Sequence, residues 1–268
     1  MEIDKNELLE ALSRSGYLLE SEIAKRLSEL NLFVATNQAI LDPLTGKSRE
    51  IDIVAEVVEF REFKSHEQII SAAAITTLVL EIKNSSSPLV LLTEMGLSPR
   101  IDNNILKTGL VCPKGIDFDR FLGFPQQLIG RDESKIFTQY CCFSPKKSSG
   151  KTEELMAHHP DNIYSALAKI TQYCEEIIWE EENSETSLFR LSLNLPVLLI
   201  NDGLFELGVS DDGHNTLNQV DCSRMVFNYF YNQRPKSSLI YVVTKKGLPA
   251  FIDKMKKINN SVIQNLHA

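Results

Sequence analysis

The sequence predicts a single α/β domain over residues 1–268, with helices at both ends of the chain and strands between them. Apolar residues recur at helical spacing over residues 5–31 and 248–266. Short apolar runs bounded by turn residues, at 50–58, 77–84 and 188–195, instead indicate strands. Because no internal repeat or linker divides the chain, one domain is the simplest organisation.

Composition excludes some classes of function. The net charge of −8 argues against a passive coat on nucleic acid, whose affinity would come from neutralising many phosphates. It is compatible with an enzyme, because acidic residues gathered around a metal ion contribute to the negative total. Local lysine clusters such as Lys245–Lys246 could still contact phosphates.

The cysteines and the chain start predict a cytoplasmic protein. The five cysteines are odd in number and show no CxxC spacing, and the charged N-terminus does not resemble a signal peptide. No apolar run approaches the roughly 18 to 20 residues of a membrane-spanning helix, so we expect no membrane partner.

The first helical region presents one carboxylate toward the interior. At about 100° per residue, Glu20 falls in the same sector as Ile23 and Leu27, whereas Glu22 points the opposite way. Gly16 is the expected weak point of this helix. Glu20 is therefore the inward acidic side chain.

Residues 32–41 and 50–58 read as two strands joined by a loop rich in turn residues, which predicts a hairpin. In the second strand, Asp52 shares a face with Val54, and Ile53 takes the other face. Residues 60–75 are polar and then alanine-rich, so we expect a loop and a short helix there.

The next strand carries two opposite charges on one face. Alternation over residues 77–84 places Glu81 and Lys83 together, with the apolar Leu80 and Ile82 on the other face. Ionised groups on a core strand cost several kcal/mol unless they are paired or liganded. This strand therefore requires a partner, such as a metal ion.

The next part of the chain, residues 94–159, shows a weaker hydrophobic pattern than the residues before it. Residues 94–159 contain scattered glycine, proline and phenylalanine, which predicts an irregular insertion. A helix over 161–182 follows, then strands at 188–195, 197–200, 220–231 and 239–244. The aromatic run at 227–231 could stack on bases, although a strand core with one exposed face is the commoner role.

These elements suggest one chemical site. If the strands are neighbours, Asp52, Glu81 and Lys83 project into one pocket, and Glu20 reaches it from the packed helix. Carboxylate oxygens suit Mg²⁺ or Mn²⁺, and a lysine could orient or deprotonate a water bound to such a metal. The alternative is structural: a buried ion pair between Asp52 and Lys83, with Glu81 in solvent.

The order of these residues resembles a known family. Glu20, then Arg49-Glu50-Ile51-Asp52, then Leu80-Glu81-Ile82-Lys83, resembles the PD-(D/E)XK, or restriction endonuclease-like, nuclease superfamily over residues 16–84. The family commonly has a proline where Ile51 stands.

The resemblance implies a restriction endonuclease-like core, in which a central mixed β-sheet is flanked by helices, and metal-dependent hydrolysis of phosphodiester bonds by an endonuclease. Asp52, Glu81 and the Ile82 carbonyl would hold Mg²⁺ or Mn²⁺, Glu20 would complete the metal site, and Lys83 would be the catalytic lysine.

The resemblance also suggests biological roles. Standalone members often serve in defence against foreign DNA, so DNA is the expected partner, with repair as the other role. An acidic protein would need a local basic surface or a homo-oligomer to hold a duplex. Two other classes stay open: a catalytically inactive nuclease-like module that binds nucleic acid or a partner protein in a larger assembly, and a structural subunit.

Overall fold

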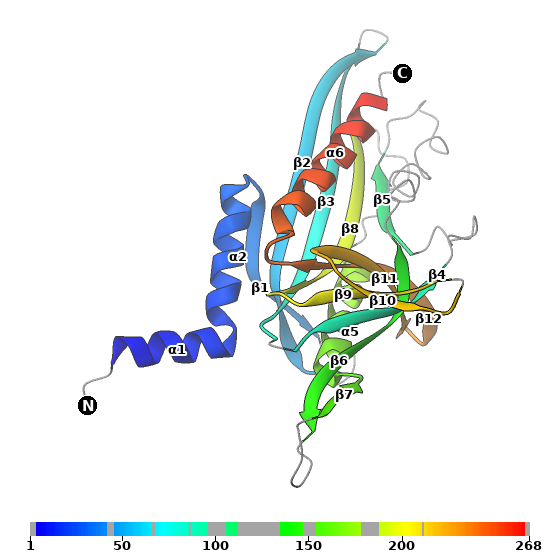
Figure 1. The fold of residues 1–268 in the computed structure, drawn as a ribbon. Coiled ribbons are helices and arrows are strands. Elements are labelled where there is room, and N and C mark those ends of the chain that lie inside the picture. Colours follow the sequence, from blue (N-terminus) through cyan, green and yellow to red (C-terminus); the bar gives the residue numbers. More distant parts are fainter. Residues whose placement is uncertain are drawn as a thin grey trace.

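The chain forms one large mixed sheet with helices packed on it, as seen in a computed structural model (Figure 1). The structure describes residues 4–41, 46–65, 68–85, 87–95, 105–111, 135–146, 154–177, 188–210 and 212–265. The predicted α/β class, with a mixed sheet flanked by helices, is therefore confirmed. Among the described residues, no helix is long and apolar enough to cross a membrane.

The helices are α1 (Lys5–Ser15), α2 (Tyr17–Glu29), α5 (Asp161–Glu176) and α6 (Leu248–Asn265). The strands are β1 (Phe33–Leu41), β2 (Ser48–Ser65), β3 (Gln68–Lys83), β4 (Leu89–Met95), β5 (Lys107–Val111), β6 (Ile136–Lys146), β7 (Glu154–His158), β8 (Leu188–Ile200), β9 (Leu204–Val209), β10 (Asn215–Gln219), β11 (Cys222–Tyr231) and β12 (Arg234–Thr244). Their order in the sheet is β1-β2-β3-β8-β12-β11-β6-β4-β9-β10, with β5 paired to β8 and β7 paired to β6.

The β2–β3 hairpin is longer than the sequence predicts. The loop and short helix expected at 60–75 are wrong, because β2 and β3 pair antiparallel from Ile53–Leu80 out to Ser65–Gln68. The alanines at 72–74 are buried in β3, whose other edge pairs with β8. Pairing on both edges outweighs the weak strand propensity of alanine.

Strand β8 pairs with β3, β5 and β12. It pairs along its length with β3, while its other edge pairs first with β5 at residues 190–194 and then with β12 at residues 197–200. Pro196 lies between these two segments, where the missing N–H removes no bond to β5 or β12. One strand through Pro196 thus replaces the two strands expected there.

The insertion predicted at about 94–159 is only partly irregular. Strand β6 lies inside the sheet between β11 and β4, while β7 pairs with β6 and β5 pairs with β8. Residues 96–104, 112–134 and 147–153 fall outside the described part of the chain. The alternation in Ile136–Lys146 is that of an ordinary strand, so the expected insertion contributes to the core.

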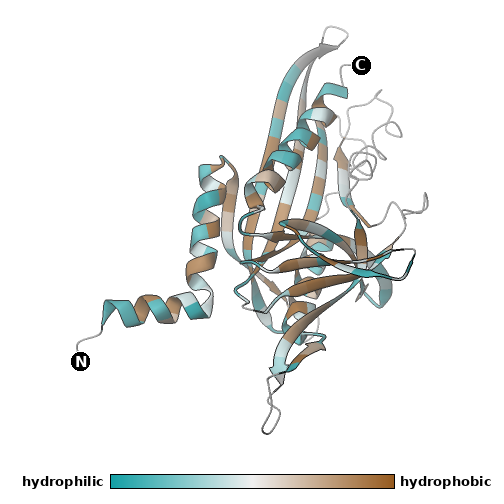
Figure 2. Ribbon diagram, in the orientation of Figure 1, coloured by the Kyte–Doolittle hydropathy of each residue, from teal (hydrophilic) through white to brown (hydrophobic). Residues whose placement is uncertain are grey.

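Two apolar cores cover the two faces of the sheet. One core joins α2 and α6 to one face, and the other joins α5 to the opposite face. Figure 2 shows apolar and polar residues alternating along α2 and α6, as expected for helices with one buried side. Glu81 shares its face of β3 with Val79 of the second core, so it faces α5.

Gly16 separates the first helical region into α1 and α2. Its φ of 93° is a conformation that favours glycine, and an added Cβ would lie 3.7 Å from Asn84 Cβ. Asn84 in turn donates a hydrogen bond of 2.6 Å to the Ser13 carbonyl. The junction of the two helices therefore lies against the end of β3, which brings Glu20 to the same end.

Candidate functional site

Glu81 and Lys83 lie together on β3, as strand alternation predicts. The side chain of Glu81 is 5% exposed, and Lys83 Nζ lies 2.8 Å from Glu81 Oε1. The interpretation in which Glu81 is in solvent and Asp52 pairs with Lys83 is therefore wrong, because Glu81 is buried and is itself the partner of Lys83.

Asp52 meets the same residues from β2. Its Oδ2 accepts a hydrogen bond of 2.7 Å from the Ile82 backbone N–H, which fixes the carboxylate beside Glu81. Burial and the charge of Glu81 together raise the pKa of Asp52 from 3.8 to about 6, against the lowering effects of that N–H and of the two nearby lysines. The nearby lysines and the Ile82 N–H thus do not offset burial and the repulsion from Glu81, so the ionised form of Asp52 is disfavoured.

Glu20 approaches from α2. It is partly buried, whereas Glu22 is exposed and pairs with Lys245, so the predicted orientation of the helix is confirmed. Burial and then the charge of Glu81 raise the pKa of Glu20, while Lys83 and Lys169 lower it. Glu20 also lies close to Gly16, because a Cβ added at that glycine would be 3.9 Å from Glu20 Oε1. Glu20, Asp52 and Glu81 are therefore electrostatically coupled through Glu81.

Lys169 on α5 is a further member of the site that the sequence analysis missed. Its Nζ lies 2.5 Å from Glu81 Oε2 and donates a hydrogen bond of 2.6 Å to the Glu50 carbonyl. It is the one basic residue of α5, and it lies between the buried Ala168 and Ile170. A lone lysine within a buried helical segment was the available signal.

One oxygen of this cluster keeps unused coordination capacity. Glu81 Oε2 is buried, and it faces the Lys169 ammonium at 2.5 Å. A buried carboxylate oxygen is normally fully hydrogen-bonded or bound to a cation. Because a carboxylate oxygen has two lone pairs, Glu81 could still contribute to a metal site beside Lys169.

The donor set fits a hard divalent ion, although it is not gathered as a finished cage. Within the described ranges, no three acidic, histidine or cysteine side chains are grouped closely enough to hold a metal. Asp52 and Glu81 are the residues that would hold Mg²⁺ or Mn²⁺ from neighbouring strands, with Glu20 and the Ile82 carbonyl as further ligands. All four ligand roles stay predictions. An ion bound there would polarise a phosphate and lower the pKa of a bound water.

Comparison with models of protein families, with curated proteins and with solved structures finds no match to this chain. The functional argument therefore rests on the geometry of these residues.

Proposed function

We propose that the chain is a metal-dependent nuclease of the restriction endonuclease-like type, which hydrolyses phosphodiester bonds of DNA in defence against foreign DNA. One observation carries the proposal: a carboxylate with a raised pKa, a buried carboxylate and a lysine converge from two paired strands at one end of the sheet. Perturbed carboxylates of this kind cluster at catalytic sites.

In this proposal, each residue has a separate role. Asp52 and Glu81 hold the metal, and Glu20 adds negative charge from α2. Lys83, whose side chain is 25% exposed, is the cation nearer to solvent and contacts the attacking water or the phosphate. Lys169, whose side chain is 14% exposed, contacts Glu81 from α5 and orients its carboxylate.

A second function has its own supporting observation. Both oxygens of Glu81 already face an ammonium group, so two lysines can neutralise the buried charge with no metal present. The same cluster would suit a catalytically inactive module that binds nucleic acid or a partner protein.

Strand cleavage separates the two functions. Purified wild type, Lys83→Ala and Lys25→Ala are incubated with supercoiled plasmid and with single-stranded DNA, in Mg²⁺, Mn²⁺ or EDTA. Lys25 is the matched control, because it lies on α2 with its side chain 79% exposed and forms its ion pair with Glu29 on its own helix.

We expect metal-dependent cleavage by wild type and Lys25→Ala, and a loss of roughly 10²- to 10⁴-fold in Lys83→Ala. Equal cleavage by Lys83→Ala, or cleavage that persists in EDTA, would contradict the proposal. A wild type that binds DNA but cleaves under none of these conditions would support the inactive module.

A further inference from the structure

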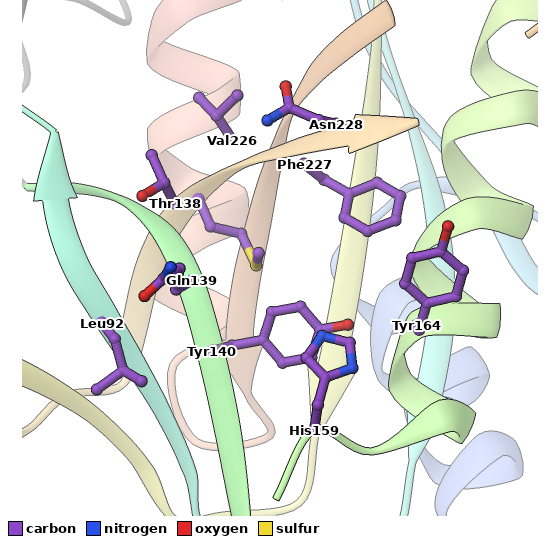
Figure 3. Close-up of a pocket in the computed structure, with 10 residues that line it drawn as sticks. Leu92, Thr138, Gln139, Tyr140, His159, Tyr164, Val226, Phe227 and Asn228 are labelled. Carbon is purple, nitrogen blue, oxygen red and sulfur yellow. The ribbon is translucent and has the colours of Figure 1, made fainter. Parts of the chain in front are cut away.

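A hollow of about 340 Å³ lies where β6 and β11 meet the start of α5 (Figure 3). Aromatic rings line it as a continuous series: the Tyr140 and His159 centroids are 4.5 Å apart, His159 and Tyr164 are 6.1 Å apart, and Tyr164 and Phe227 are 5.5 Å apart. Phe227 and Tyr140 are fixed in the sheet core, and Tyr164 is 38% exposed on α5. The hollow is therefore an aromatic cavity with two rigid sides and one accessible side.

Two side-chain amides lie at the rim of this cavity. Gln139 Oε1 accepts a hydrogen bond of 2.8 Å from Thr93, and Asn228 Oδ1 accepts one of 2.7 Å from Ser237. Both amide oxygens are thus engaged, and neither amide nitrogen has a partner among the described residues. Both residues are exposed, and each is the strand neighbour of a ring-bearing residue, Tyr140 or Phe227, so its side chain points away from the series of rings.

The Tyr140 hydroxyl is a third polar group with no partner. Tyr140 is 6% exposed, and its buried oxygen makes no hydrogen bond with any residue that the structure describes. A buried hydroxyl without a partner is unfavourable and uncommon in folded proteins. A ligand with a polar edge would satisfy it.

These features together select one chemical class of ligand. The described residues that line the cavity include no Asp, Glu, Lys or Arg, which favours a neutral ligand over a phosphate or an ion. Successive rings are tilted by 41° to 64° against one another, so a flat ring could stack on one of them, and Tyr164 is the most accessible. The unpartnered Tyr140 hydroxyl favours a polar atom at the edge of that ring. A nucleobase is neutral and flat and has polar atoms at its edge, and proteins bind unstacked bases by stacking them on aromatic side chains.

The cavity shares a helix with the candidate metal site. Tyr164 and Lys169 are five residues apart on α5, which corresponds to about 7.5 Å along the helix axis. A base in the cavity and a phosphate at Glu81 could therefore belong to one strand.

We propose that this cavity binds a single unstacked nucleobase of the substrate strand, close to the phosphodiester that the acidic site receives. The choice of substrate rests on the proposed nuclease function, but binding of the base is measurable without cleavage. The side chains that would carry it are Tyr164 as the stacking surface and the Tyr140 hydroxyl at the base edge.

The probe is a single-stranded oligonucleotide that contains 2-aminopurine, whose fluorescence is quenched when the base stacks on an aromatic ring. It is titrated in EDTA, so that no cleavage occurs, with wild type, Tyr164→Ala, Tyr140→Phe and Phe230→Ala. Phe230 is the matched control, because it lies on β11 near Phe227 but is 74% exposed and does not line the cavity.

We expect quenching by wild type and Phe230→Ala, and affinity lower by roughly 5- to 100-fold in Tyr164→Ala, since one stacking surface is lost. Tyr140→Phe keeps the ring and removes only the hydroxyl, so a smaller loss of about 3- to 10-fold is expected. Circular dichroism verifies that each variant is folded.

Equal affinity and quenching in Tyr164→Ala, Tyr140→Phe and Phe230→Ala would overturn the base site, as would a wild type that gives no quenching. The two proposals fail separately. A protein that cleaves DNA without quenching the probe keeps the nuclease function and loses this cavity, and a protein that quenches without ever cleaving does the reverse.

Discussion

Replacing Asp52 by Asn should stabilise the metal-free protein while it abolishes activity. The pKa of Asp52 rises from 3.8 to about 6 in the folded state, and each tenfold change in an equilibrium is worth about 1.4 kcal/mol, so ionised Asp52 opposes folding by about 3 kcal/mol at neutral pH. The side chain is only partly buried, and solvent screening reduces this figure to about 1 to 3 kcal/mol. Asparagine removes the charge and can still accept the hydrogen bond from Ile82.

The raised pKa of Asp52 determines how its effect on the free energy of unfolding changes with pH. Below pH 3.8 the folded and unfolded states both keep the proton, so Asp52 has no effect. Between pH 3.8 and about 6 the unfolded chain loses its proton first, so stability falls as the pH rises, and above about pH 6 the loss is constant. Asp52→Asn should therefore match wild type near pH 3.5 and exceed it at pH 7.5.

Thermal and urea unfolding in EDTA measure this difference. For a chain of this size, about 1 to 3 kcal/mol corresponds to a Tm higher by about 2 to 10 °C at pH 7.5. The exposed Lys25→Ala should show no such change with pH. A lower Tm for Asp52→Asn than for wild type at pH 7.5 would refute the electrostatic argument, because it would mean that the ionised carboxylate stabilises the fold.

Two further predictions concern residues that the sequence did not connect. Lys169→Met should raise the pKa of Asp52 above about 6, since the positive charge of Lys169 lowers it; a carboxyl ¹³C titration by NMR measures this, and an unchanged midpoint would show that Lys169 does not act on Asp52. Asn259→Leu should lower the free energy of unfolding by about 2 to 4 kcal/mol, because it leaves the Thr76 hydroxyl and the Val57 carbonyl unpaired in the core. Urea unfolding tests the latter, and a loss below about 0.5 kcal/mol would contradict it.

Local patterns predict much of the site. Alternation alone places Glu81 and Lys83 on one face of a strand, and helical periodicity alone turns Glu20 inward, because both depend on residues a few positions apart. The antiparallel pairing of β1 with β2 also follows from the intervening turn residues. These features survive in the structure because local preference and tertiary packing agree.

Long-range pairing was not predictable in the same way. The alanines of β3 resemble a helix until β2 and β8 are known to flank them, so the β2–β3 hairpin was underestimated. Lys169 is far from Glu81 in sequence, and no periodicity links α5 to that strand. The role of Glu81 as the partner of two lysines therefore emerged only from the fold.

Metal binding tests the central claim most directly. Calorimetric titration of Mn²⁺ into wild type, Asp52→Asn and Lys25→Ala is carried out at pH 7.5 and again at pH 5. Binding by wild type and Lys25→Ala at pH 7.5, weaker binding at pH 5 where the Asp52 proton competes, and none by Asp52→Asn is the predicted result. Equal binding by wild type and Asp52→Asn, or no binding by any of them, would contradict the assignment of this carboxylate cluster as a metal site.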